Sequence, residues 1–352
     1  MCIRDSTYVI INGAIVVLVW TGAVRVDNGY ITQGEVVALI NYMSQILVEL
    51  VKLANLIINI NKSIACGNRI QSIFEMQPSI TDGSGQKVDK VRTDTADRSE
   101  EAEYAVEFSH VGLTYAGAGD ESLTDIDFKV KKGETIGIIG GTGSGKSSVV
   151  NLIPRFYDVT SGFIKVDGKD VKDYPLEELR GKIGTVLQKA VLFHGTIREN
   201  LKWGNPDATE EDLNRAITVA QAKEFVDKKE GRLDFEIEQG GKNLSGGQRQ
   251  RLTIARAVVK KPEILILDDS ASALDFATDA ALRKAIREME GETTVFIVSQ
   301  RAASIQHADR IVVLDDGKIV GLGTSEELLE SCEVYQEIYN SQFKKQEGGK
   351  TA

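Results

Sequence analysis

The sequence TIGIIGGTGSGKS, residues 135–147, decides the fold class of this chain. Residues 135–139 are a compact apolar run suited to a buried strand, and residues 147–152 begin a helix. Between them lies the pattern GxxxxGK[ST], whose backbone N–H groups and following helix start favour bound phosphate. The sequence therefore predicts a phosphate-binding loop in an α/β nucleotide-binding fold.

The loop supplies the first candidate contacts for a nucleotide. Lys146 offers a positive charge to phosphate, and the Ser147 hydroxyl can ligate Mg²⁺. The predicted contacts are Gly140, Gly141, Thr142, Gly143, Ser144, Gly145, Lys146, Ser147 and Ser148.

A second buried strand, residues 264–268, ends in a carboxylate. Asp268 is placed to hold Mg²⁺ through water, as the acidic end of such strands does in P-loop enzymes. A helix-capping role for Asp268 is the alternative, which the adjacent acid, Asp269, makes weaker.

The pentapeptide Leu244-Ser245-Gly246-Gly247-Gln248 follows the phosphate loop at a characteristic distance. In this order and spacing the two motifs resemble an ATP-binding cassette (ABC) protein, and the resemblance covers residues 104–343. It implies a P-loop NTPase with a mixed β-sheet core, an antiparallel β subdomain and a helical signature subdomain. In that family the pentapeptide completes the ATP site of a partner domain.

The resemblance also implies roles for other residues. Tyr115 matches the aromatic residue that stacks on adenine, and Gln188 matches the glutamine that contacts Mg²⁺ and the membrane domain. Ser245, Gly246 and Gly247, with Gln248, match the signature that binds the γ-phosphate of ATP held by the opposing subunit. Asp275 ends the loop that links the two sites of the dimer. The implied ligands are ATP and Mg²⁺.

Two positions depart from the family pattern, and both concern hydrolysis. Asp269 stands where a glutamate normally polarises the attacking water, and Gln300 stands where a histidine contacts the γ-phosphate. Aspartate withdraws the carboxylate by about 1 Å, a displacement that can lower a rate roughly a hundredfold. Glutamine hydrogen-bonds phosphate but carries no charge. We expect a slow ATP site in one subunit of a heterodimeric exporter, with a homodimer of reduced activity as the alternative.

The first 77 residues predict part of a transmembrane domain, with membrane helices at about 7–26 and 35–60 followed by a cytoplasmic extension. The connector carries Asp27 and Glu35, whereas Lys62 and Arg69 follow the second helix. The positive-inside rule then places the ATP-binding domain in the cytoplasm of a multi-pass protein of the cell membrane. Two buried helices of a soluble domain are the alternative. The segment resembles the last two membrane helices of an exporter half-transporter, which normally has six, so we expect a fragment.

Polar residues form a stripe on one face of the second helix. Because polar groups are costly at membrane depth, this face should look into a cavity or a helix bundle. A substrate pathway and packing against neighbouring helices both remain open. The stripe consists of Asn41, Gln45, Glu49, Lys52, Asn55 and Asn59.

The remaining segments are polar. Residues 78–103 have the composition of a linker, residues 344–352 read as a polar tail, and residues 1–6 continue no recognisable helix, which raises the suspicion that they are not native.

Composition limits the possible partners. A net charge of -10 argues against nucleic acid, and three Cys without a CxxC pair exclude a zinc knuckle. We therefore expect a second ABC half-transporter, membrane lipid and an unidentified exported substrate as partners. A regulatory ATP-binding module is a second hypothesis, and a soluble ABC protein acting on ribosomes or DNA is a third.

Overall fold

The computed structural model describes residues 2–76, 78–83, 103–270, 272–289 and 292–347. The chain divides into two compact units, Met1–Ser79 and Ile80–Ala352.

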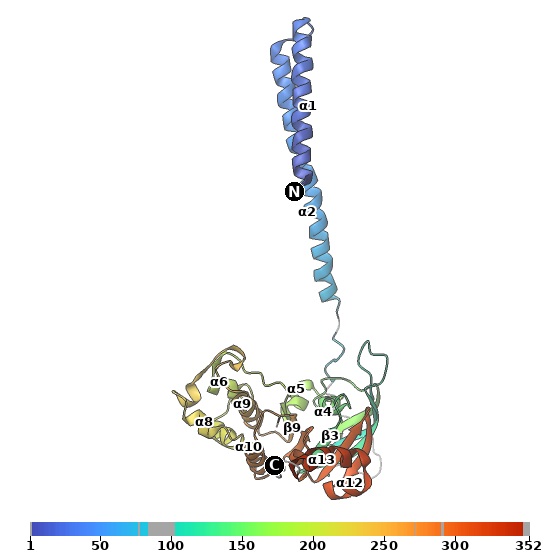
Figure 1. The fold of residues 1–352 in the computed structure, drawn as a ribbon, viewed down its shortest axis with the longest axis vertical. Helices are drawn as coiled ribbons and strands as arrows, with labels where there is room; N and C mark the ends of the chain where they lie inside the picture. The colour runs from blue at the N-terminus through green and yellow to red at the C-terminus, as the bar shows by residue number, and fades with distance from the viewer. Residues whose placement is uncertain (1, 77, 84–102, 271, 290–291, 348–352) are drawn as a thin grey trace. The chain divides into compact units, whose positions relative to one another are not determined.

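The first unit is a pair of helices, α1 (Cys2–Asp27) and α2 (Gln33–Phe74), and α1 lies beside the first part of α2 (Figure 1). Thr32 begins α2 with a capping box, in which the Glu35 carboxylate accepts from the Thr32 N–H at 2.7 Å. Gly22 lets the helices approach closely, since a Cβ there would lie 2.7 Å from Val36 Cγ1.

Both helices are long and apolar enough to cross a membrane, and their most apolar 18-residue windows have mean hydropathies of 2.0 within Val9–Asp27 and 1.6 within Gln33–Phe74. Only 6% of each most apolar window is buried within the structure, unlike the helices of a soluble core. At about 1.5 Å per residue the 42 residues of α2 extend for about 63 Å, twice a bilayer core of about 30 Å. Helix α2 therefore continues past residue 60, where the predicted membrane helix ends, through the segment predicted as an extension of that helix.

Helix α1 also differs from expectation, because it begins at Cys2 and not near residue 7. Residues 2–6 are continuous with the helix, so the expectation that they continue no helix was wrong.

The second unit is built on a six-stranded sheet in the order β12-β11-β3-β10-β9-β6. Every neighbouring pair is parallel except β11 and β12, so the sheet is mixed as the sequence predicted. The strands are β3 (Thr135–Gly140), β6 (Ile183–Val186), β9 (Ile264–Asp268), β10 (Thr294–Val298), β11 (Arg310–Asp315) and β12 (Lys318–Gly323).

Two smaller sheets accompany it. The antiparallel subdomain has the order β2-β1-β4-β5, and β7 pairs with β8. Their strands are β1 (Tyr104–Leu113), β2 (Leu123–Lys131), β4 (Ser161–Val166), β5 (Lys169–Asp170), β7 (Gly195–Thr196) and β8 (Glu236–Ile237).

The helices surround these sheets, and α6, α8 and α9 gather in a helical region (Figure 1). They are α4 (Lys146–Leu152), α5 (Leu176–Lys182), α6 (Ile197–Lys202), α7 (Glu210–Val219), α8 (Lys223–Asp227), α9 (Gly246–Val258), α10 (Phe276–Arg287), α11 (Ala302–Ile305), α12 (Ser325–Ser331) and α13 (Glu333–Glu347), with short 3₁₀ turns at Arg232–Asp234 and Gln239–Gly241.

The five parallel strands of the six-stranded sheet are buried on both faces. Successive strand side chains point to opposite faces, so Leu265 and Leu267 of β9 join one apolar cluster while Ile264 and Ile266 join the other. This double burial explains why the strands read as continuous apolar runs, and it holds the carboxyl ends of β3, β9 and β10 rigidly.

Part of the expected linker rests on the second unit. The Asp82 carboxylate accepts from the Leu176 N–H at 2.7 Å and so caps α5, where the cap residue, Pro175, makes no side-chain bond. A Cβ on Gly83 would lie 2.5 Å from the Tyr174 carbonyl oxygen. At the other end, α13 extends to Glu347, and residues 348–352 lie outside the described residues.

Candidate functional site

The phosphate loop connects β3 to α4, as the sequence predicted. Gly145 precedes α4 with a φ of 93°, a left-handed conformation that glycine adopts without strain. A Cβ at Gly140 would lie 2.1 Å from the Leu314 carbonyl oxygen, so only glycine fits where the loop leaves the sheet. These glycines hold the loop open toward a cavity of about 610 Å³, a volume usual for small-molecule sites.

Lys146 is buried under this loop. Its ammonium donates to the carbonyls of Gly140, at 3.0 Å, and Gly141. Burial lowers the pKa of Lys146, while the nearby carboxylates of Asp269 and Asp268 oppose the shift. A phosphate would offer this ammonium the anion that a buried cation requires, so the residue fits a nucleotide.

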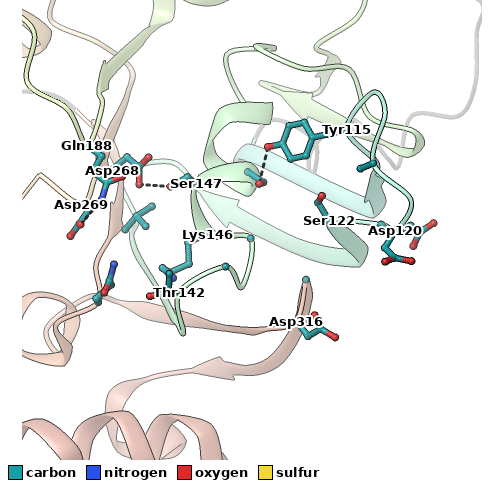
Figure 2. A pocket seen from close by; sticks show the side chains of 18 of the residues that line it. Tyr115, Asp120, Ser122, Thr142, Lys146, Ser147, Gln188, Asp268, Asp269 and Asp316 are labelled. Carbon is teal, nitrogen blue, oxygen red and sulfur yellow. Dashed lines mark hydrogen bonds between the residues drawn. The ribbon is translucent and has the colours of Figure 1, made fainter.

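Ser147 and Asp268 meet beside the loop. The Ser147 hydroxyl donates to the Asp268 carboxylate at 3.0 Å (Figure 2). Asp268 is buried at the end of β9, and burial raises its pKa against the effect of this hydrogen bond. Within the described residues no cluster of three His, Cys, Asp or Glu could hold a metal alone. A cation here would use these two oxygens with phosphate and water, which suits Mg²⁺.

Asp269 and Gln188 lie at the end of the cavity opposite Tyr115, and Lys146 lies between the two ends (Figure 2). The Gln188 side-chain amide donates to the Asp269 carboxylate at 3.2 Å. Asp269 has a φ of 45°, a region that only a few per cent of residues other than glycine adopt, and its N–H donates to the Val298 carbonyl at 3.0 Å. Gln300, two residues after Val298, also lines the cavity.

Tyr115 lines the other end of the cavity. Its hydroxyl donates to the Ser148 hydroxyl at 2.9 Å, and its ring meets Tyr157 edge-on with centroids 4.9 Å apart. The half-buried ring lines the cavity and offers it an aromatic surface on which a base can stack.

The predicted signature, Leu244 to Gln248, lies outside this cavity. Ser245 caps α9 in a capping box with Gln248, whose side-chain oxygen accepts from the Ser245 N–H at 3.1 Å. Ser245 and Gly246 are exposed, and neither they nor Gly247 line the cavity. The structure therefore does not bring the predicted signature together with the predicted phosphate loop.

Asp275 also stands apart from the cavity. Its carboxylate caps α10 by accepting from the Thr278 N–H at 2.9 Å and the Thr278 hydroxyl at 2.8 Å. These hydrogen bonds, the one from the backbone first, lower the pKa of Asp275.

Comparison with known proteins agrees with this geometry. Residues 123–272 match the family model of the ABC transporter. The second unit contains an ABC transporter ATP-binding domain. The P-loop fold with a mixed sheet, preceded by a helical region, is thereby confirmed.

Relatives extend the similarity into the helix pair. An uncharacterised ABC transporter ATP-binding protein of Mycobacterium tuberculosis is 39% identical over 96% of this chain, and the chain spans 56% of its length. An ATP-dependent lipid A-core flippase of Vibrio vulnificus is 34% identical over 94% of this chain, and the match covers 55% of the flippase's length. The structure of a bacterial Atm1-family ABC exporter with ATP bound has a TM-score of 0.71 and 29% identity, over 89% of this chain and 53% of that one.

Sequence reasoning missed several residues of the ATP-binding domain's cavity. They come from the loop before β2, from the end of β10 and from the turn between β11 and β12, which the two sheets bring beside the phosphate loop. The acidic residues Asp120, Glu121 and Asp316 belong to none of the recognised motifs. Only the Asp316-Gly317 pair gives a local signal, because Asp-Gly is typical of a tight turn. The missed residues are Ala118, Gly119, Asp120, Glu121, Ser122, Val298, Ser299, Asp316 and Gly317.

Proposed function

We propose that the chain is the ATP-binding and ATP-hydrolysing part of a membrane exporter. The observation that carries the proposal is one cavity that joins the phosphate loop to Ser147, Asp268, Asp269 and Gln188. The exposed apolar surfaces of α1 and α2, and relatives named as exporter and flippase, support a multi-pass protein of the cell membrane with a cytoplasmic ATP-binding domain.

Within this cavity each residue has a distinct role. The loop backbone and Lys146 bind the phosphates of ATP, and the Tyr115 ring stacks on adenine. Ser147, Asp268 and Gln188 hold Mg²⁺, which supplies charge neutralisation at the phosphates. Asp269 orients the attacking water and accepts its proton.

The site needs a second half-transporter. Ser245 and Gly246 present a capped helix start to solvent, away from the chain's own cavity. Helix starts favour anions, so this surface fits the terminal phosphate of ATP held by a partner. Two such chains facing each other would complete two sites.

The chain's own site turns ATP over slowly, and its partner in the dimer is a different half-transporter. The Asp269 carboxylate is one methylene shorter than glutamate and already bonds to Gln188. Gln300 offers no positive charge to a phosphate. The same two residues also support the second candidate, a regulatory module in which bound ATP clamps the dimer with little hydrolysis. A homodimer of reduced activity is the remaining arrangement.

The polar stripe on α2 contributes to the path of the exported molecule. Glu49 and Lys52 form an ion pair of 2.7 Å beside a groove of about 510 Å³ that also includes Tyr42 and Gln45. Ionisable groups at membrane depth typically line such pathways. Membrane lipid surrounds the helices.

The ATPase rate of the purified full chain tests the proposal. We expect the chain by itself to hydrolyse ATP slowly. Addition of a second half-transporter with an intact glutamate and histidine should raise the rate by about tenfold or more. Hydrolysis by the chain alone at the rate of that pair would refute the slow site. Absence of ATP binding would refute the whole proposal.

A further inference from the structure

The C-terminal helix α13 holds the loop that carries Gln300. The Gln342 side-chain oxygen accepts from the Ala302 N–H at 2.9 Å, and its side-chain nitrogen donates to the Gln300 carbonyl at 2.7 Å. Both ends of one amide are therefore used, and the side chain bridges the backbone on either side of Arg301.

The loop is also held from its other side. The Ser299 hydroxyl accepts from the Arg301 N–H at 2.9 Å, and the Ser299 N–H donates to the Ile138 carbonyl at 3.1 Å. The Arg301 guanidinium donates to the Ser272 carbonyl at 3.3 Å. With Ser299 fixed to β3, the two hydrogen bonds of Gln342 anchor the backbone of the next three residues from the side of α13.

Helix α13 is a firm support for this bridge. Tyr335 is fully buried, and its hydroxyl lies 2.8 Å from that of Ser325. Ile338, Tyr339 and Phe343 pack against the apolar cluster under the main sheet. The helix is thus attached to the core of the ATP-binding domain, and Figure 1 shows it beside α12.

We propose that Gln342 is a positioning residue for the nucleotide site, which sets the place of the Gln300 side chain and thereby the preference for nucleoside triphosphate over diphosphate. Gln300 follows Val298, which bonds to Asp269 at the cavity end opposite Tyr115. A triphosphate reaches further toward this end than a diphosphate. The inference rests on the proposed function, and it extends the site to a helix that does not line the cavity.

The test measures two affinities of the full chain in detergent with Mg²⁺, for ADP and for a non-hydrolysable ATP analogue. Gln342→Leu removes both hydrogen bonds at nearly constant volume. Gln336→Leu is the matched control, because Gln336 lies on α13 but donates to the Leu329 carbonyl at 2.8 Å, away from the loop. Gln300→Ala, alone and combined with Gln342→Leu, shows whether the effect passes through the Gln300 side chain.

We expect Gln342→Leu to lower the ratio of triphosphate to diphosphate affinity by about three- to tenfold, while the ADP affinity stays unchanged. Gln336→Leu should leave the ratio unchanged, and Gln342→Leu should add nothing in the Gln300→Ala background. If Gln342→Leu unfolds, Gln342→Glu keeps the acceptor for Ala302, loses the donor to Gln300, and should lower the ratio likewise.

An unchanged ratio in the Gln342 variants would overturn the inference, as would an equal fall in Gln336→Leu or an effect that persists without the Gln300 side chain. A full chain that bound neither nucleotide would overturn the proposed function as well, so the two failures are distinguishable.

Discussion

The phosphate loop and the Ser245 signature are both glycine-containing helix starts, yet they face different surroundings. The loop opens into a cavity built from β9, β10, α4 and neighbouring turns of the same chain. The signature begins a regular helix whose first residues are exposed. One region thus has its counterpart residues within the chain, whereas the other presents an exposed helix start that does not line the cavity. The difference teaches that similar local sequences become different sites through what the fold places opposite them.

The largest expected effect separates the two regions by function. Ser245→Arg should lower the ATPase rate of the assembled dimer about 100- to 1,000-fold, because it removes a donor to the terminal phosphate and fills its place. ATP binding by the chain alone should be unchanged. The checks are steady-state hydrolysis of the dimer and calorimetric binding to the single chain.

The second test restores the expected catalytic pair. Asp269→Glu with Gln300→His should raise hydrolysis at the chain's own site by up to about a hundredfold, because the carboxylate advances by about 1 Å. Asp269→Asn should reduce the dimer's rate far less than Ser245→Arg does. A severe loss in Asp269→Asn would mean that this chain holds the faster site.

The third test addresses binding in the cavity. Lys146→Ala should weaken ATP binding by about 10- to 100-fold, since a charged hydrogen bond to phosphate is lost. Lys284→Ala is a matched control, because that side chain is 77% exposed on α10. Equal losses in the two variants would indicate a general effect of charge.

The smallest effect is a dependence on pH. Burial lowers the pKa of Lys146 from its ordinary value of 10.5. In the empty site the ammonium therefore loses its proton, and with it the positive charge, at a lower pH than a free lysine does. Bound phosphate favours the charged form and raises this pKa. ATP affinity should therefore fall as pH rises from the lowered pKa to that of the bound form, by up to tenfold per pH unit. In Lys146→Ala this fall should disappear, as measured by calorimetry between pH 7 and pH 10.

Local patterns made much of the fold predictable. The runs that form β3 and β9 are buried on both sheet faces, which leaves little choice of residues other than apolar ones. The phosphate loop and Ser147 lie within one continuous stretch, so their meeting needs no knowledge of the tertiary structure. Asp268 could be placed because its strand ends at the same edge of the sheet.

Other parts of the site depend on the tertiary structure. Asp120 and Asp316 reach the cavity from separate turns, which meet only because the antiparallel subdomain packs against the six-stranded sheet; the Thr124 N–H there donates to the Gly317 carbonyl at 2.9 Å. Gln342 meets Gln300 across 42 positions with no motif around either residue. Residues 2–6 were wrongly placed outside α1, because helix boundaries in apolar sequence carry few signals.

The capping box at Ser245 has a consequence for the entropy of assembly. Because Gln248 and Ser245 already hold each other, the first turn of α9 keeps one conformation in the isolated chain. Ordering a flexible surface typically opposes association by about 0.5–1.5 kcal/mol for each side chain that must be fixed. A surface ordered in advance avoids that loss, so association depends on the shape and charge of the arriving partner and much less on folding at the interface.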